Sequence, residues 1–188
     1  MQTFSTTKWD LHVDVCPCDV HFNEWIETAK LTDRTIYHFG TGTHHVVGRT
    51  QAGNGSGNRV FGITASREEC ESYAELVTAD ARVAKSYLCY FGDIYLTNPR
   101  LLPRFDVVNL FHLCEFFDPE TTAKNGGLDD RALLDAMTER TRPGGHVLFY
   151  TGSKDFDAAQ PIIAAWEKTQ PVERAGAFKT LLIYRKRA

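Results

Sequence analysis

The sequence has no apolar run long enough to cross a membrane and no cluster of lysine or arginine residues. A membrane helix needs about 20 consecutive apolar residues, and binding to nucleic acid through charge alone needs a basic surface. The first residues, MQTFSTTKWDLHVDV, have no basic start followed by an apolar core, which argues against a secretory signal peptide. We therefore expect a cytoplasmic protein with neither a membrane nor a nucleic-acid partner.

The sequence also lacks an internal repeat and any sign of a second domain. Of the 188 residues, 43% are hydrophobic and 24% are charged, and the formal net charge is −3. These values are typical of soluble globular proteins, and the length suits one domain that buries a sizeable core. We therefore predict a single domain over residues 1–188. The sequence does not indicate its oligomeric state.

The cysteines are odd in number, which argues against a framework of disulfides and favours free thiols in a reducing cytoplasm. Near the N-terminus, the stretch HVDVCPCDVH contains four residues of the types that bind zinc. Its C-x-C spacing is tighter than the usual C-x₂₋₄-C, and a proline stiffens it. We expect two free thiols near the surface and no bound metal, with zinc as the alternative; the four residues are His12, Cys16, Cys18 and His21.

Apolar segments with strand and helix patterns alternate along the chain, which predicts an α/β fold with a mainly parallel sheet. Pro143-Gly144-Gly145 is expected to stop one helix, and Ser66 to cap another with Glu69 as its capping-box partner. In such sheets, ligands bind beyond the carboxyl ends of the strands. Strands are expected over 35–40, 59–64, 86–93, 105–113, 146–153 and 178–186, and helices over 20–31, 43–50, 67–80, 128–141 and 156–170.

Five blocks follow in an order that resembles the class I S-adenosylmethionine-dependent methyltransferases: HFGTGT, FGITAS, YFGDIYL, FDVVNLFHL and LLDAMTERTRPGGHVLFYTGS. The similarity extends from about Val20 to the C-terminus. It implies a three-layer α/β/α Rossmann-like sheet of seven strands, mainly parallel, with an antiparallel last strand. It also suggests that the N-terminal segment and helix, residues 1–31, cover the cleft.

The resemblance implies S-adenosylmethionine as the cofactor and places its contacts at four strand ends. The glycine turn would pass under the methionine part, because a side chain there would clash. Asp93 would accept from the adenine amino group, although it could instead cap the next segment. The residues implied are Phe39, Gly40, Thr41 and Gly42; Thr64 and Ala65; Gly92, Asp93 and Ile94; and Asn109, Leu110 and Phe111.

Three positions depart from the family pattern. His38 replaces the usual first acid, His44 the third glycine, and Thr64 the acid for the ribose hydroxyls. Loss of a charged acceptor costs roughly 1–3 kcal/mol, so we expect Thr64→Asp to strengthen cofactor binding. His38, His44 and His45 are not expected to converge on a metal, because neighbouring side chains diverge; we predict one packed histidine and one that lines the cleft.

The resemblance implies methyl transfer to a small-molecule acceptor. His112 and Glu115 follow the fourth strand, and either could act as a general base, or His112 could be packed and Glu115 solvated. Aromatic faces suit a cationic donor, and Phe39, Phe111 and Tyr37 are the candidates.

Two other functions remain open. One is a non-catalytic domain that has lost the cofactor and acts in protein interaction. The other is an NADP-dependent oxidoreductase, because Arg67 follows the second strand, where an arginine accommodates the 2′-phosphate.

Overall fold

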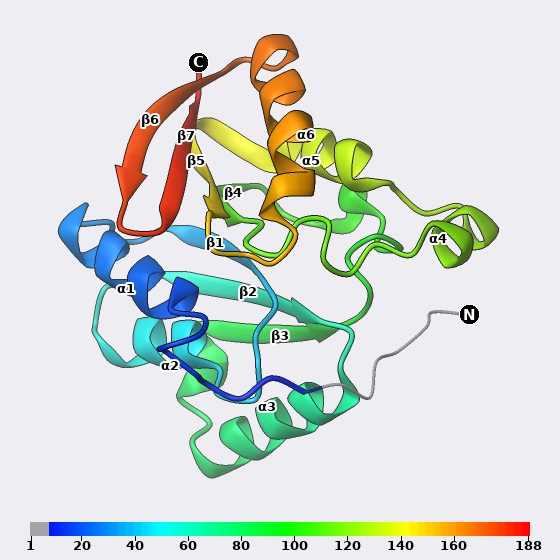
Figure 1. Cartoon of the computed structure of the whole chain (residues 1–188). Helices are drawn as coiled ribbons and strands as arrows, with labels where there is room; N and C mark the ends of the chain where they lie inside the picture. The colour runs from blue at the N-terminus through cyan, green and yellow to red at the C-terminus, as the bar shows by residue number, and fades with distance from the viewer. Residues whose placement is uncertain (1–7) are drawn as a thin grey trace.

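A seven-stranded sheet forms the centre of the molecule in the computed structural model, which describes residues 8–188 (Figure 1). The strand order is β3-β2-β1-β4-β5-β7-β6. Strands β1 to β5 pair in parallel, and β7 runs antiparallel to both of its neighbours. The strands are β1 Thr35–Phe39, β2 Arg59–Thr64, β3 Tyr87–Phe91, β4 Phe105–Asn109, β5 Thr141–Tyr150, β6 Val172–Phe178 and β7 Leu181–Lys186.

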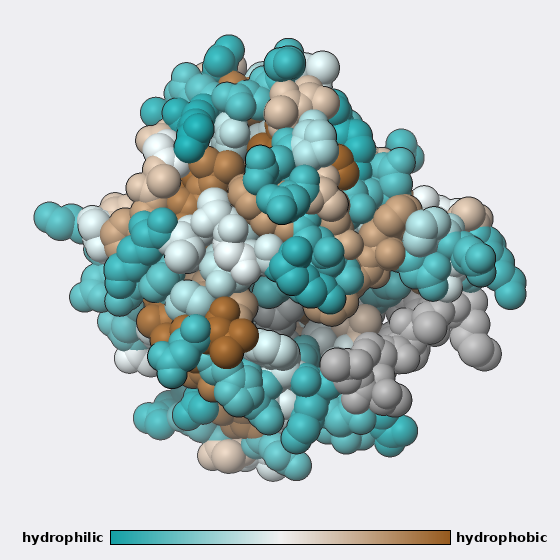
Figure 2. Space-filling view, viewed as in Figure 1, coloured by the Kyte–Doolittle hydropathy of each residue, from teal (hydrophilic) through white to brown (hydrophobic). Residues whose placement is uncertain are grey.

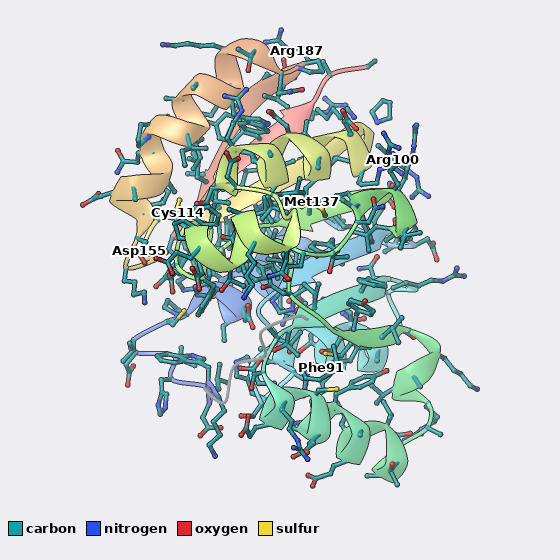
Figure 3. All side chains as sticks on the ribbon, turned by 90° about the vertical axis from the view of Figure 1, so that its right-hand side faces the viewer. Phe91, Arg100, Cys114, Met137, Asp155 and Arg187 are labelled. Atoms are coloured by element: carbon teal, nitrogen blue, oxygen red, sulfur yellow. The ribbon has the colours of Figure 1, made fainter. Side chains whose placement is uncertain are left out.

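Helices cover both faces of the sheet, which gives the predicted α/β/α layers. On one face, α1, α2 and α3 pack against a cluster that includes Phe22 and Val60. On the other face, α5 and α6 pack against a second cluster that includes Met137 and Trp166 (Figure 3). The helices are α1 Cys18–Thr28, α2 Val46–Gly53, α3 Arg67–Ala79, α4 Pro119–Asn125, α5 Asp130–Arg140 and α6 Phe156–Thr169, with short 3₁₀ turns at Val83–Lys85 and Pro99–Leu101.

The apolar side chains lie mainly between these layers. Burial of one large side chain such as Phe22, which is fully buried, contributes roughly 1.5–3 kcal/mol. Hydrophilic residues cover most of the face seen in Figure 2, and hydrophobic ones lie between them. Over residues 8–188, the helices are too short or too polar to pass through a bilayer.

Several predicted boundaries are wrong. Helix α1 begins at Cys18 rather than at residue 20, and α2 extends to Gly53, into a stretch predicted as loop. Helix α5 ends at Arg140, before the predicted Pro-Gly-Gly stop. Residues 143–145 lie inside β5, which begins at Thr141. Phe105 of β4 pairs with Thr141 at the beginning of β5, and the register shifts before the next pair, Val107 and His146. This pairing with β4 extends β5 across the two glycines.

Strand β6 and helix α4 are absent from the sequence prediction. Most side chains of β6 are exposed or partly exposed, because the strand lies at the edge of the sheet and pairs only with β7. An edge strand of this kind shows little apolar alternation. Helix α4 is short, with Asp118 as its N-cap and Gly126 as its C-cap in the left-handed region, and it lies away from the sheet (Figure 1).

Candidate active site

Four parallel strands, β1 to β4, end at one edge of the sheet, and the predicted cofactor residues lie there. The turn after β1 contains Gly40 and Gly42 at φ +82° and +58°, a region that favours glycine. A Cβ on Gly40 would lie 3.3 Å from the His112 ring. A Cβ on Gly42 would overlap the His44 ring and lie 2.9 Å from the Trp9 carbonyl oxygen. The turn therefore leaves no room for side chains at these two positions.

Residues 8–17 run against this glycine turn. The Trp9 amide donates to Glu69 Oε1 at 3.2 Å, and the Trp9 carbonyl accepts from the Thr43 amide at 2.8 Å. The Thr43 hydroxyl also bonds to the Asp10 carboxylate. These contacts hold the N-terminal segment at the strand ends where the resemblance places the cofactor. Residues 1–7 of the predicted covering segment lie outside the described residues.

The end of β2 has an acid that the sequence pattern did not reveal. Thr64 Oγ1 donates to Glu69 Oε2 at 2.6 Å, and Glu69 is only 7% exposed. Ser66 caps α3 as predicted, because its hydroxyl accepts from the Glu69 amide. The capping box stays incomplete, since the Ser66 amide donates to Thr64 Oγ1 at 3.0 Å. Burial raises the pKa of Glu69, and donors that include Thr64, Trp9 and Gly42 oppose this shift.

A second acid lies beside His38, the position at which the family usually has its first acid. His38 Nε2 lies 3.0 Å from Asp19 Oδ1, and both residues are buried. His44 Nε2 lies 4.0 Å from the other oxygen of Asp19. Burial by itself would raise the pKa of Asp19, but the His38 ring lowers it below its ordinary value. Helix α1 thus supplies a carboxylate next to the position where β1 lacks one.

We expect Asp19→Asn to lower the free energy of unfolding by about 1.5–3 kcal/mol, the contribution of a buried hydrogen bond to a charged group. Asp14→Asn is the matched control, because Asp14 is exposed on the same segment, and a change within about 0.5 kcal/mol is expected there. Urea denaturation of the two variants measures the difference. Equal small effects would mean that the Asp19–His38 pair does not stabilise the fold.

The three histidines near the glycine turn have different surroundings: His38 and His44 face the Asp19 carboxylate, and His45 does not. His45 is buried, with one ring nitrogen 2.7 Å from the Tyr87 hydroxyl and the other 2.9 Å from the Glu69 carbonyl. Burial lowers the pKa of His45 to about 4. His38 and His45 are therefore both packed, rather than the single histidine that was predicted, and the His44 ring lies over Gly42 of the glycine turn.

The end of β3 positions Asp93 through a turn. Asp93 Oδ1 accepts from the Tyr95 amide at 2.8 Å, which is the capping role that stood as the alternative to cofactor binding. Burial raises the pKa of Asp93. The next side chain, Ile94, is buried in the core, and Gly92 donates its amide to the Thr64 carbonyl at 2.9 Å. Asp93 is only partly buried, and its carboxylate has a second oxygen, Oδ2, that does not take part in the Tyr95 bond.

The residues at the end of β4 are fully buried. Asn109 Oδ1 accepts from the Phe39 amide at 3.0 Å, while its Nδ2 has no partner among the described residues. Leu110 and Phe111 are buried, and the Phe111 ring packs edge-on against Phe22 of α1 at 5.5 Å. Only Asn109 therefore offers an unused polar atom at this strand end.

Two predicted contacts are directed away from the site. Tyr37 is fully buried and stacks on Phe61 at 5.9 Å inside the core, so the prediction that it offers an aromatic face to the cofactor is wrong. The Thr41 side chain is buried and lies 3.8 Å from the Cys89 thiol. Within the glycine turn, Thr41 therefore contributes its backbone atoms to the strand end, while its hydroxyl points into the core. Ala65 lies at the end of β2 and is partly buried.

His112 and Glu115 meet in the turn after β4. His112 Nδ1 lies 3.0 Å from Glu115 Oε1, and the Ser153 hydroxyl bonds to the same carboxylate from the loop after β5. In Figure 3, Cys114 and Asp155 show where the two loops meet at this end of the sheet. The prediction of a solvated Glu115 is therefore wrong, because two side chains bond to it.

The N-terminal cysteines also lie at this edge. Cys16 Sγ is 3.4 Å from Cys18 Sγ, which in turn is 3.9 Å from His112 Nε2. Cys18 is 3% exposed, so the expectation that both thiols lie near the surface is wrong for this one. His21 Nδ1 bonds to the Thr180 hydroxyl at 2.8 Å. The four-residue set that stood as the alternative does not assemble, and among the described residues His112 joins the two cysteines instead of His12 or His21.

This cluster changes the protonation of its members. Hydrogen bonding to Cys18 and the nearby His112 ring lower the pKa of Cys16 to about 5. Burial alone would lower the pKa of His112, but Cys16 and Glu115 raise it to about 10. A histidine that already holds a proton at neutral pH cannot accept one, which opposes the predicted general-base role of His112.

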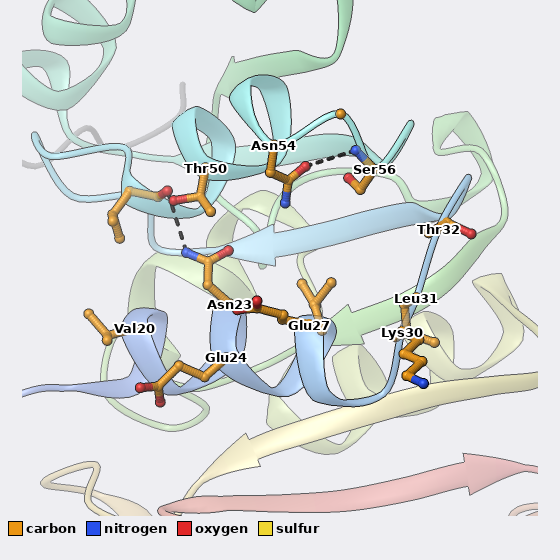
Figure 4. A pocket seen from close by; sticks show the side chains of 13 residues that line it. Val20, Asn23, Glu24, Glu27, Lys30, Leu31, Thr32, Thr50, Asn54 and Ser56 are labelled. Carbon is orange, nitrogen blue, oxygen red and sulfur yellow. Dashed lines mark hydrogen bonds between the residues drawn. The ribbon is translucent and has the colours of Figure 1, made fainter.

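A separate groove of about 600 Å³ lies between α1 and α2 (Figure 4). Asn23 bridges its walls, because its side chain bonds to the Val46 carbonyl and to Gln51. The groove is distinct from the strand ends at which the acids, thiols and glycine turn meet. It is lined by Val20, Asn23, Glu24, Ile26, Glu27, Lys30, Leu31, Thr32, Val46, Thr50, Asn54, Gly55 and Ser56.

No protein-family model matches the chain, and no curated protein matches it. Several solved structures, however, resemble this chain in their fold. NodS, an N-methyltransferase from Bradyrhizobium japonicum WM9 in complex with S-adenosyl-L-homocysteine, matches with a TM-score of 0.62 and 13% identity over 93% of this chain and 90% of that one. The [4+2]-cyclase SpnF matches with a TM-score of 0.60 and 13% identity over 90% and 81%. A putative rRNA-methylase from Clostridium thermocellum matches with a TM-score of 0.58 and 16% identity over 89% and 96%.

These similarities confirm the predicted fold, which is the Rossmann-like sheet of the class I methyltransferases. At such low identity they define the fold alone. The three neighbours also differ in what they act on, by their own descriptions, so the activity of this chain has to be argued from its site.

Proposed function

We propose that this chain transfers a methyl group from S-adenosylmethionine to a small molecule. The observation that carries the proposal is the Glu69 carboxylate, buried 2.6 Å from the Thr64 hydroxyl at the end of β2. In the methyltransferases that the chain resembles, an acid at this strand end accepts from the ribose hydroxyls. A buried carboxylate is costly unless hydrogen bonds satisfy it, and in this structure Thr64, Trp9 and Gly42 donate to Glu69. We propose that the two hydroxyls of a ribose replace the Trp9 donor at this strand end.

Other residues at the strand ends fit the same cofactor. The backbone at Gly40 and Gly42 allows close approach, and Asp93 stands at the end of β3, where it would accept from the adenine amino group. Asn109 Nδ2 is a buried donor without a protein partner. The Trp9 amide occupies one oxygen of Glu69, so we propose that residues 8–17 shift when the ribose binds.

S-adenosylmethionine supplies an electrophilic sulfonium methyl when bound. The residues of this chain would then orient the acceptor and exclude water, which are the main requirements of such a displacement. The pKa of His112, which Cys16 and Glu115 raise, opposes a role as base. A small acceptor is preferred over nucleic acid because the chain has a net charge of −3 and no run of more than three basic residues.

An NADP-dependent oxidoreductase is less consistent with this site. The Arg67 side chain is 74% exposed and pairs with Glu71 at 2.7 Å on the surface of α3. The buried carboxylate of Glu69 would repel a 2′-phosphate. The antiparallel β7, inserted between β5 and β6, also differs from the usual 3-2-1-4-5-6 strand order of dinucleotide-binding sheets.

Calorimetric titration with S-adenosylhomocysteine and with NADPH tests the proposal. We expect S-adenosylhomocysteine to bind, and Glu69→Gln to weaken it by about 10- to 100-fold, since a hydrogen bond to a charged group contributes about 1.5–3 kcal/mol. Glu71→Gln is the control, because Glu71 is exposed on the same helix. Binding of NADPH alone would favour the oxidoreductase, and binding of neither would favour the non-catalytic domain.

The same titration has a predicted pH dependence. Burial raises the pKa of Glu69 above its ordinary value of 4.5, and the ribose hydroxyls need the ionised form. Affinity should therefore fall as the pH is lowered through this raised pKa, and Glu69→Gln should remove that part of the dependence. A wild-type affinity that stays constant across the range would exclude Glu69 from the site.

A further inference from the structure

The thiols of Cys16 and Cys18 and the ring of His112 form a cluster at the edge of the sheet that methyl transfer does not use. One ligand atom from each lies within 4.8 Å of the other two, and among residues 8–188 no other set of three such residues meets this criterion. Cys18 is buried and the other two residues are partly buried. Two sulfurs and one imidazole nitrogen are ligands that zinc prefers.

The separations within the cluster fit a tetrahedral ion. Zinc bonds of about 2.3 Å to sulfur and about 2.05 Å to nitrogen place two sulfurs about 3.8 Å apart, and a sulfur and a nitrogen about 3.6 Å apart. The observed distances are 3.4 Å between the two sulfurs and 3.9 Å between Cys18 Sγ and His112 Nε2. For these two pairs, movements of a few tenths of an ångström would reach the tetrahedral values, and the third pair, between Cys16 and His112, lies within 4.8 Å.

The surroundings also orient the ligands. His112 presents Nε2 to the thiols because its Nδ1 is held by Glu115 at 3.0 Å, and Ser153 bonds to that carboxylate in turn. A carboxylate on the far nitrogen of a ligating histidine is the usual support in zinc sites. Pro17 at the start of α1 and the turn over residues 12–16 fix the two cysteines of the C-x-C stretch on the same side.

We propose that Cys16, Cys18 and His112 bind one Zn²⁺ ion, with the fourth position open to water or to a small ligand. Zinc binds thiolate sulfurs and an unprotonated imidazole nitrogen, so binding displaces whatever protons these three ligand atoms still hold. Three protein ligands with one open position are the arrangement of catalytic rather than structural zinc. The ion would lie beside the glycine turn, because the His112 ring is the nearest group to Gly40. This site is independent of whether S-adenosylmethionine binds.

Metal analysis of the full chain, purified without chelators, tests the proposal. We expect one equivalent of zinc, and after replacement by Co²⁺ the thiolate-to-cobalt absorption and intense ligand-field bands of a tetrahedral site. Cys16→Ser, Cys18→Ser and His112→Gln should each remove or strongly weaken these bands. Glu115→Gln should lower zinc affinity by about 10- to 100-fold, as loss of a supporting carboxylate does.

His21→Gln is the matched control, because His21 belongs to the set expected from the sequence but bonds to Thr180 instead. It should keep the full metal content, as should Cys70→Ser on α3. Circular dichroism of every variant separates loss of metal from loss of fold. Any of four results would overturn the proposal: zinc well under one equivalent with no cobalt bands at millimolar Co²⁺, copper in place of zinc, a Cys16–Cys18 disulfide in fresh protein, or equal loss in His21→Gln and His112→Gln.

Discussion

Gly42→Ala is expected to abolish binding of S-adenosylhomocysteine, with a loss of more than about 100-fold, or about 2.7 kcal/mol. Gly42 has φ +58°, and a Cβ there would overlap the His44 ring and lie 2.9 Å from the Trp9 carbonyl. The new methyl group would occupy the surface that the backbone offers to the cofactor. Calorimetric titration of the variant measures the loss.

Gly55→Ala separates this steric effect from backbone strain. Gly55 has φ +70°, yet a Cβ there meets no atom within 4 Å. Both substitutions place alanine in the left-handed region, which costs about 1–2 kcal/mol of stability. Only Gly42→Ala should affect the ligand. Wild-type affinity in folded Gly42→Ala would place the cofactor elsewhere.

Thr64→Asp should weaken both the fold and the cofactor site, the reverse of what the family pattern alone predicts. Thr64 Oγ1 already lies 2.6 Å from Glu69 Oε2, so an aspartate would set two carboxylates against each other. Like charges about 4 Å apart repel by roughly 4 kcal/mol in a partly buried site. We expect a loss of about 3 kcal/mol in unfolding free energy near pH 8, which shrinks at lower pH as one carboxyl takes up a proton.

A double variant tests the cause of this effect. Thr64→Asp with Glu69→Gln returns the site to a single carboxylate, now on β2, and should recover most of the lost stability and affinity. Thr64→Asn is the matched control for size, because it adds no charge. Urea denaturation and titration with S-adenosylhomocysteine measure both quantities. If the double variant is no better than Thr64→Asp, repulsion by Glu69 is not the cause.

The predictions for Asp19, Thr64 and Glu69 depend on the same feature, the position of two acids. Both acids that the motifs lack are present, but on other elements: Asp19 of α1 lies beside His38, and Glu69 of α3 lies beside Thr64. The Asp19–His38 pair is buried, and it fixes α1 against the end of β1. Two of the histidines around the glycine turn, His38 and His44, thus lie beside a carboxylate from outside the motif.

The sequence by itself determined the architecture. The alternation of apolar segments predicted an α/β fold with a mainly parallel sheet, and β2 spans residues 59–64 as its pattern indicated. It also determined which strand ends meet, because parallel strands end at the same edge. These features depend on local periodicity and on turns, which neighbouring residues encode.

Only the tertiary structure decided which side chains serve the site. Cys18 and His112 are 94 residues apart, and Asp19 and His38 are 19 apart, so no spacing within a motif could pair them. The same holds for β6, whose exposed side chains carry no strand signal and whose conformation depends on pairing with β7. Glu69 had a local role as a capping residue, but burial against Thr64 and Trp9 directed its carboxylate to the strand end instead. Such choices depend on packing and on satisfying buried charges, which arise only when distant segments meet.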